Sequence, residues 1–101
     1  TVGRGRGDTF ESLIDACEAG KLKAVKAAIA KGADPKKHEE FGQTPFSIAC
    51  QAGALDVCKF LVSEHGVSVI QVDKSNQSPF WWACMAGKLD VCKWLLTLPN
   101  V

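Results

Sequence analysis

The sequence predicts an all-α solenoid in which three helix–turn–helix units stack side by side, joined by extended or short hairpin-like loops. Cys17, Cys50 and Cys84 recur at nearly equal intervals along the chain. Each cysteine is followed by a glycine at the third position after it and by a leucine at the fifth. Self-similarity with a period of roughly 20 to 50 residues is typical of stacked arrays. The chain is therefore expected to be an internal repeat.

The start of each unit carries a helix-starting signal. Thr44-Pro45 places an N-cap residue before a proline, whose missing N–H costs nothing at the first helical position. Ser78-Pro79 repeats this device in the third unit. The first unit has no such pair, but Asp8 is expected to cap, with Glu11 reaching back from the third position after it, as in a capping box.

Glycines are expected to end the helices. Gly20, Gly53 and Gly87 follow first helices of about two turns, where a left-handed residue is needed to reverse the chain. Second helices are predicted over residues 22–31, 55–64 and 89–97, with Gly32 and Gly66 ending the first two. The segment from Gly32 to Gly42 has no helical period and is predicted to be an extended turn.

Apolar residues at helical spacing mark the buried faces of the second unit. The short helix is expected to bury Phe46, Ala49 and Cys50. Its longer partner is expected to present Val57, Cys58, Leu61 and Val62.

These residues carry a family resemblance. Thr44-Pro45-Phe46-Ser47-Ile48-Ala49 resembles the T-P-L-H-x-A signature of ankyrin repeats, with Phe for Leu and Ser for His. The segment 78–83 is a looser copy, and Leu13 to Gly20 resembles the atypical N-terminal repeat that caps such arrays. The resemblance covers roughly residues 9 to 101. It implies a flexible segment 1–8, a cap-like repeat 9–38, a second repeat 39–72 and an incomplete third repeat 73–101.

Three departures from the family pattern have consequences. The second unit has one extra residue, which fits best at 63–67, so a local bulge is expected there. Ser47 and Trp81 replace the family histidine, whose hydrogen bond must be made differently or not at all. The third unit stops without a polar closing helix, so we expect further repeats or another surface to cover this end.

Composition and charge exclude several functional classes. A net charge of +1, from 12 basic and 11 acidic side chains, gives no electrostatic reason to expect nucleic acid or an anionic membrane as the main partner. The apolar fraction of 47% is that of a folded domain. No apolar run approaches the roughly 20 residues of a membrane span. Five cysteines, an odd number, favour a reducing, intracellular compartment, cytoplasmic or nuclear.

Catalytic, cofactor and metal signatures are missing from the sequence. His38 and His65 are expected in loops of different units, and neither belongs to a triad or zinc-protease motif. The cysteines form no C-x-x-C; instead Cys50/Cys58 and Cys84/Cys92 repeat a C-x7-C spacing that places one cysteine on each helix of a pair. We predict a packing role for these thiols, with redox or metal roles as the alternative. No enzymatic activity, cofactor or small-molecule substrate is expected.

The lysines of the first unit are the basis for a nucleic-acid alternative. Residues 1–37 carry 8 basic and 5 acidic side chains (+3), whereas the remainder carries 4 basic and 6 acidic (−2). A solvated outer helix face is the favoured interpretation, because phosphate binding requires the lysines to cluster in space.

Protein binding is the predicted function. Stacked repeats present a concave face of turn tips and short inner helices. The ankyrin resemblance implies that a partner is held at Glu40, Phe41, Gln43, Gln51 and Ala52 in the second unit, and at Lys74, Ser75, Gln77, Met85 and Ala86 in the third. Trp81 is added to this predicted set as an aromatic residue of the third inner helix. A regulatory or targeting domain of a larger protein, with its catalytic or channel part elsewhere, is the alternative.

Aromatic residues sharpen this expectation. Phe41 is the strongest candidate, because an aromatic residue at a turn tip has little core to join. Its alternative is to fold onto the turn of the next unit. Trp81 and Trp82 are adjacent, so one should pack while the other lies near the concave face or the open end. Trp94 takes the position of Phe60 and is expected in the core or against a further repeat.

Overall fold

The computed structural model describes residues 9–99 and residue 101. This part of the chain contains helices and no strands, which confirms the all-α prediction. The predicted flexible segment 1–8 and the predicted cap Asp8 lie outside the described residues. In chain order the helices are α1 (Thr9–Ala19), α2 (Leu22–Ala30), α3 (Pro45–Ala52), α4 (Leu55–His65), α5 (Pro79–Met85) and α6 (Leu89–Leu95).

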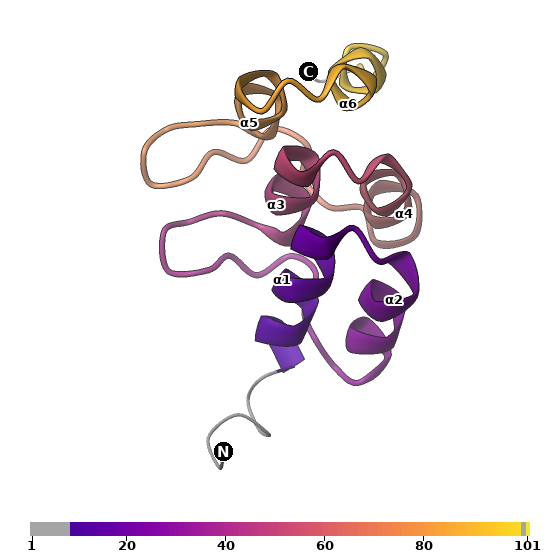
Figure 1. Ribbon diagram of the computed structural model, residues 1–101. Helices are drawn as coiled ribbons and strands as arrows, with labels where there is room; N and C mark the ends of the chain where they lie inside the picture. Colours follow the sequence, from indigo (N-terminus) through magenta and orange to yellow (C-terminus); the bar gives the residue numbers. More distant parts are fainter. Residues whose placement is uncertain (1–8, 100) are drawn as a thin grey trace.

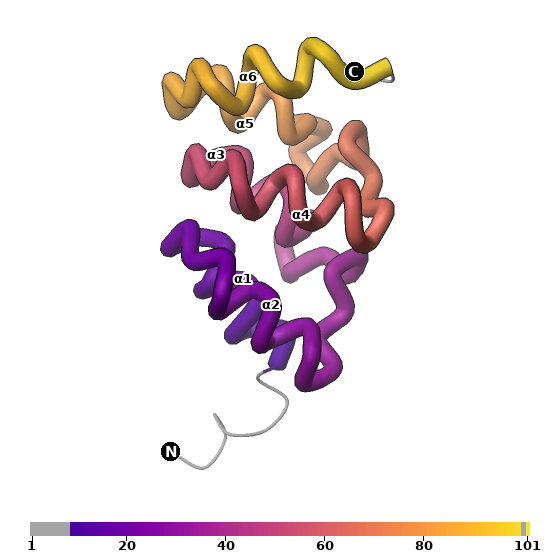
Figure 2. The backbone as a smooth tube through the Cα atoms, turned by 90° about the vertical axis from the view of Figure 1, so that its right-hand side faces the viewer, coloured from indigo at the N-terminus to yellow at the C-terminus, as the bar shows by residue number. Residues whose placement is uncertain are grey.

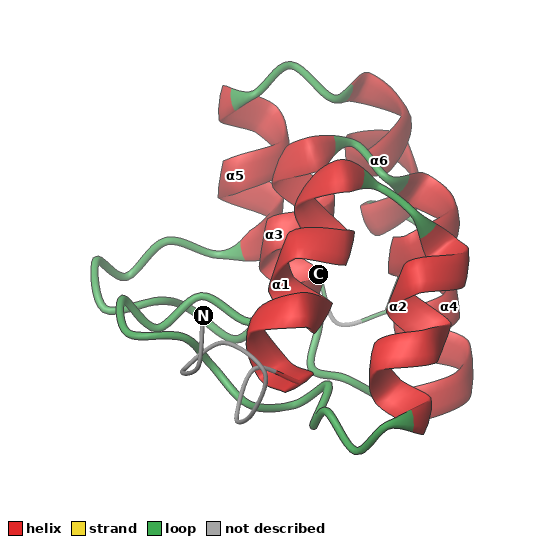
Figure 3. Ribbon diagram, turned by 60° about the horizontal axis from the view of Figure 1, so that its bottom comes forward, coloured by secondary structure: helices red, strands yellow, loops and turns green. Residues whose placement is uncertain are grey.

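The helices stack as three antiparallel pairs. Helix α1 packs on α2, α3 on α4 and α5 on α6, while α1, α3 and α5 form a row that we call the inner row (Figure 1). Helices α2, α4 and α6 form the outer row. The orthogonal view in Figure 2 shows the pairs as successive layers of a body measuring 41 × 27 × 21 Å. The tips of the loops that join the layers project to one side, beside the inner row (Figure 3).

The inner helices α3 and α5 begin as the sequence predicts. The Thr44 hydroxyl accepts a hydrogen bond from the Ser47 N–H at 3.2 Å, and the Ser78 hydroxyl accepts one from the Trp81 N–H at 3.1 Å. Proline occupies the first turn of both helices. Each cap satisfies one of the N–H groups that a helix start leaves without a partner.

The predicted glycine turns also form. Gly20, Gly53 and Gly87 have φ values of 69°, 76° and 71°. Each donates its N–H to the carbonyl of the preceding inner-helix cysteine, at 3.1 Å in all three cases. The three helical hairpins therefore share one backbone frame, which gives equivalent residues equivalent positions.

Helix lengths differ from prediction at four points. Helix α1 has 11 residues rather than about two turns. Helix α3 begins at Pro45, but the first unit has no proline at the equivalent position, so α1 begins further before its glycine turn. Helix α2 is capped by Lys31, immediately before Gly32. The extra residue of the second unit is taken up by α4, which continues to His65 before Gly66 ends it, so the expected bulge is absent. Helix α6 ends at Leu95, short of Thr97.

The core runs between the two rows of helices. Leu13, Phe46, Leu61 and Leu95 are fully buried along it. Trp94 on α6 is half-buried and meets the Phe46 ring edge-on at 6.1 Å, which ties the third repeat to the second. Within the described residues no helix is both long and apolar enough to span a bilayer.

Ser47 occupies the position of the family histidine in α3. Its hydroxyl is buried and finds no hydrogen-bond partner among the described residues. The histidine's bond is therefore not replaced, and the structure retains an unsatisfied polar group beside its core.

Candidate partner-binding face

The loop tips are held by a repeated acid clamp. The Glu39 carboxylate accepts hydrogen bonds from the Phe41 N–H at 2.7 Å and the Gln43 N–H at 2.9 Å. Asp73, at the equivalent position of the next repeat, accepts from the N–H groups of Ser75 and Gln77, both at 2.9 Å. Backbone bonds close both turns, from residue 39 to 43 and from residue 73 to 77. Such clamping keeps a loop tip rigid.

Glu39 and Asp73 were not predicted as site residues. The sequence does contain a pattern that could have identified them: each stands at the same spacing before the N-cap residue of its repeat, Thr44 or Ser78. A carboxylate at the start of a turn can accept backbone N–H bonds from the residues that follow, as Asp does in an Asx turn; Glu39 makes the same bonds with a longer side chain.

Partial burial alone would raise the pKa of Asp73, but its hydrogen bonds outweigh that effect. The Gln77 N–H, the Trp82 indole and the Ser75 N–H donate to this carboxylate, as does the Gln43 side chain. The pKa of Asp73 therefore lies below its ordinary value. The Gln43 contact also links the two turns.

The two turn tips dock on each other. The Lys74 N–H donates to the Phe41 carbonyl at 3.0 Å. Gly42 is buried beneath this contact, and a Cβ built there would lie 2.7 Å from the Lys74 nitrogen. The backbone of the second tip is thus fixed both by its own acid clamp and by the turn above it.

Phe41 extends from this fixed backbone with 67% of its surface exposed. Its side chain is therefore not buried on the next turn, although its carbonyl contacts that turn. The neighbouring predicted residues Glu40, Lys74 and Ser75 are also exposed, while Gln43 and Gln77 are half-buried.

The remaining residues of the predicted partner-binding set lie on the inner helices α3 and α5 or directly after α5. Met85 is 66% exposed and Trp81 38% exposed, whereas Gln51 and Ala52 are half-buried and Ala86 is exposed. Trp82 is the member of the tryptophan pair that packs: its indole N–H donates to Asp73 at 2.8 Å, and its ring meets Trp81 edge-on at 4.9 Å. The predicted set thus lies on two turn tips and two inner helices; its role in binding stays a prediction.

An open groove of about 550 Å³ lies at the first repeat, between α1 and the first loop. Phe10 and Ile14 form its apolar part, and the Lys37 ammonium lies 4.9 Å from the Phe10 ring centre. Five carboxylates line the groove beside Lys37 and His38: Glu11, Asp15, Glu18, Glu39 and Glu40. This end of the face is therefore predominantly acidic, whereas the third repeat presents Trp81 and Met85.

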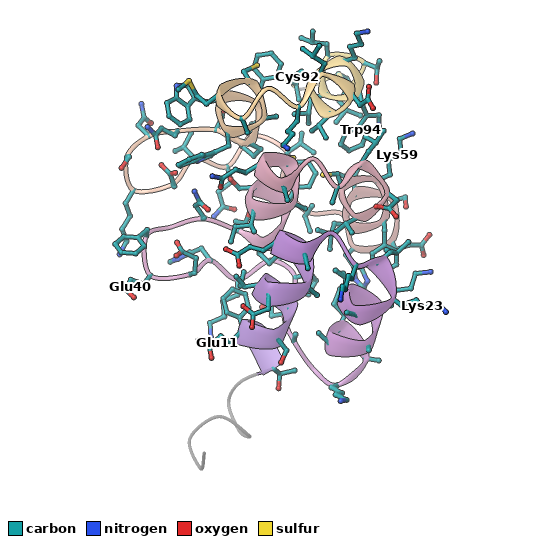
Figure 4. The ribbon with its side chains drawn as sticks, viewed as in Figure 1. Glu11, Lys23, Glu40, Lys59, Cys92 and Trp94 are labelled. Carbon is teal, nitrogen blue, oxygen red and sulfur yellow. The ribbon has the colours of Figure 1, made fainter. Side chains whose placement is uncertain are left out.

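The lysines of the first repeat lie elsewhere. In Figure 4, Glu11 and Glu40 lie on the side of the loop tips, and Lys23 and Lys59 lie on the opposite side, along the outer row. Lys21, Lys23, Lys26 and Lys31 are exposed on or beside α2, and Lys26 approaches the Phe60 ring at 5.3 Å. The charge of the first unit is thus separated into an acidic inner helix and a basic outer one.

The histidines do not form a catalytic pair in the described residues. His38 is exposed, with Nδ1 3.0 Å from the Glu39 carbonyl oxygen. His65 is the last residue of α4 rather than a loop residue, and its ring packs edge-on against Phe60 at 5.2 Å. The described part of the chain contains no cluster of three or more side chains suited to hold a metal.

The cysteines lie on the helices that the repeat register predicts. Cys17, Cys50 and Cys84 are on the inner row, and Cys58 and Cys92 are on the outer row. Burial raises the pKa of Cys17 to about 12 and also raises that of Cys50, so both remain neutral thiols. Cys84, by contrast, is exposed, which differs from the expectation that all five are packed.

The family model described as "Ankyrin repeats (3 copies)" matches residues 13–101. The chain belongs to the ankyrin repeat family. Ankyrin repeats generally serve as protein-interaction modules.

Curated relatives match about half of the chain. Protein phosphatase 1 regulatory subunit 27 of Homo sapiens is 38% identical over 52 residues, which are 52% of this chain and 34% of the relative; its Mus musculus counterpart gives the same values. Ankyrin repeat domain-containing protein oryK of Aspergillus oryzae is 35% identical over 51 residues, 50% of this chain and 8% of that protein. The matched segment thus spans about a third of the first two relatives.

Proposed function

We propose that this ankyrin stack is a recognition module that binds a segment of a partner protein on the face formed by the loop tips and the inner row, without catalysis of its own. The observation that carries the proposal is the exposure of Phe41 on a backbone fixed by Glu39 and by the Lys74 turn. An aromatic residue on a rigid support loses little entropy on binding and is suited to anchor an interface.

The charge distribution favours one kind of partner segment. The groove beside α1 is lined by five carboxylates against one lysine and a histidine, and the third repeat offers the exposed Trp81 and Met85. We propose that the segment carries Lys or Arg where it crosses the first repeat and apolar residues where it crosses the third. Electrostatic complementarity of this kind sets the orientation of binding more than its strength.

A displayed peptide library and a set of matched variants test this proposal. Peptides selected on the wild-type chain are measured by biolayer interferometry against Phe41→Ala, Met85→Ala and, as control, Leu96→Ala, which removes an equally exposed apolar side chain beyond the end of the outer helix α6. We expect the first two variants to weaken binding by roughly tenfold or more and Leu96→Ala to leave it unchanged. Equal affinity for all the variants would refute the proposed face.

A second pair of variants tests the orientation. Asp15→Lys and Glu40→Lys reverse charge at two exposed positions of the groove. They should weaken binding of the selected peptides only when the Lys or Arg residues of the peptide are present. If both variants bind those peptides as well as wild type does, the basic-segment proposal is wrong.

The alternative is that the stack is a regulatory or targeting domain of a larger protein. The observation favouring it is the similarity to two relatives named as regulatory subunits of protein phosphatase 1. The same face would then hold a protein segment of the enzyme that is regulated. Sequencing of the full open reading frame, followed by co-purification of its product with protein phosphatase 1, distinguishes this case. We further propose a reducing intracellular compartment, in keeping with the five free thiols.

A further inference from the structure

Two thiol pairs bridge the inner and outer rows. The Sγ atoms of Cys50 and Cys58 lie 3.5 Å apart, and those of Cys84 and Cys92 lie 3.3 Å apart. Both pairs sit on the same backbone frame, because Gly53 and Gly87 close the two hairpins with the same bond to the carbonyl of the first cysteine. The chain thus carries one thiol arrangement twice.

The two pairs differ in their access to solvent. Cys50 and Cys58 are fully buried, because α5 packs against α3 and α6 against α4. Cys84 is exposed and Cys92 retains 8% of its surface, since the described helices that pack against α5 are α3 and α6. Figure 4 labels Cys92 between α5 and α6, at the end of the stack away from the N-terminus. In the 101-residue chain a reagent in solution can therefore reach Cys84, and Cys92 lies directly beside it.

We propose that in this 101-residue chain Cys84 and Cys92 form an oxidisable dithiol, which closes to an intramolecular disulfide within the third repeat when a low-molecular-weight disulfide such as oxidised glutathione is present. Nothing in the ankyrin framework requires this chemistry, because the repeat packs with both thiols reduced. The equivalent pair Cys50/Cys58 stays reduced in the folded chain because the third repeat covers it.

The reaction proceeds by two exchanges. Cys84 loses its proton and its sulfur attacks one sulfur of the small disulfide, which breaks the small disulfide's S–S bond and releases one thiolate. Cys92 then loses its proton and attacks the Cys84 sulfur, which forms the protein S–S bond and releases the second thiolate. The two released thiolates take up two protons. In total, two protein thiols are oxidised and one small disulfide is reduced to two thiols.

The order of these exchanges follows from the geometry. Cys84 is the exposed thiol and therefore meets the reagent first. Cys92 resolves the mixed disulfide, because it is nearly buried and lies within 3.3 Å of the Cys84 sulfur. The product needs a further approach of more than an ångström to reach the S–S bond length of about 2.05 Å. This approach must occur within the third repeat, because Cys84 lies on α5 and Cys92 on α6.

Trypsin distinguishes the two pairs in a single sample. Lys88 separates Cys84 from Cys92, so cleavage gives the peptides 75–88 and 89–93, which remain linked only if the disulfide has formed. Cys50 and Cys58 lie together in the peptide 38–59. The reduced 101-residue chain is incubated with oxidised glutathione under native conditions, its free thiols are alkylated, and the digest is analysed by mass spectrometry without reduction.

We expect the linked 75–88/89–93 species to accumulate on the order of tenfold faster than oxidation of peptide 38–59, because reaction at the buried pair requires local opening. Cys92→Ser should leave glutathione attached to Cys84, and Cys84→Ser, at an exposed position, should leave Cys92 unmodified. Circular dichroism checks that both variants are folded. The proposal is overturned if wild type keeps glutathione on Cys84 without the linked species, if peptide 38–59 oxidises equally fast, or if no cysteine reacts.

Discussion

Replacement of Gly42 by asparagine tests how closely the second and third repeats are packed. Gly42 has φ +88°, and the equivalent position of the next repeat is Asn76, with φ +63°. Asparagine tolerates positive φ better than other residues with a Cβ. At position 42, however, a Cβ would lie 2.7 Å from the Lys74 nitrogen and 3.1 Å from the Asp73 Cα, and both are backbone atoms. Gly42→Asn therefore introduces a close contact into a conformation that asparagine can adopt.

The cost of this contact can be worked from its parts. Relief requires the Lys74 turn to move away, which breaks the hydrogen bond from its N–H to the Phe41 carbonyl and costs about 1 kcal/mol. Displacement of a packed backbone adds the cost of overpacking, about 1–2 kcal/mol. We expect Gly42→Asn to lower the free energy of unfolding by about 2–3 kcal/mol, the sum of these two costs. The reverse change, Asn76→Gly, should cost less than about 1 kcal/mol because only chain entropy is affected.

Urea unfolding measured by two probes checks the reasoning. All three tryptophans, Trp81, Trp82 and Trp94, lie in the third repeat, so fluorescence reports on that repeat while circular dichroism reports on all the helices. Because repeats are coupled through their interfaces, a weakened contact should move the fluorescence transition to lower urea than the dichroism transition. If the stabilities of Gly42→Asn and Asn76→Gly agree by both probes to within about 0.5 kcal/mol, the scale of a neutral surface change, the turns do not pack as described.

Two further predictions concern buried or clamped polar groups. Asp73→Asn keeps the size of the side chain and removes its charge. The folded pKa of Asp73 lies below the unfolded value of about 3.9, so wild type should be more stable than the variant above about pH 4. This advantage should vanish as the pH falls through the folded pKa. Equal pH profiles in urea titrations would contradict the clamp. Ser47→Ala removes the buried hydroxyl that has no partner and should raise the free energy of unfolding by about 1 kcal/mol. Ser47→Cys is a control of similar size. A loss of stability in Ser47→Ala would show that the hydroxyl is hydrogen-bonded.

The sequence predicted those parts of the fold that depend on local chemistry. Thr44 and Ser78 cap because the cap bond lies within one turn of the chain, and Gly53 reverses the chain because left-handed backbone is a property of one residue. Periodicity also located the fully buried Phe46. These features recur at the same spacing from the inner-helix cysteine of each unit. Aligning the units on these cysteines therefore predicted the helices and turns of all three.

Features that depend on a neighbouring repeat were not predictable in the same way. Cys50 and Cys84 have the same local sequence, but Cys50 is buried and Cys84 exposed because, among the described helices, a further repeat packs over the first and not over the second. Gly42 lies beneath the turn of the third repeat, whereas Asn76 has no further turn above it in the part of the chain that the structure describes. The acid clamp of Glu39 was missed for a different reason: a charged loop residue is usually solvated, and its role is visible only when the turn has closed.

The clamp separates the proposed binding role of the loop tip from its contribution to stability. The backbone N–H of Phe41 is held by the Glu39 carboxylate and its carbonyl by the Lys74 N–H, so the conformation of the tip does not depend on the aromatic side chain. The exposed ring can therefore change without loss of the fold, so Phe41→Ala tests the proposed binding role of the side chain separately from stability. A loop tip that is rigid in its backbone and free in its side chain suits a recognition surface, because the ordering entropy of the loop is lost on folding rather than on binding.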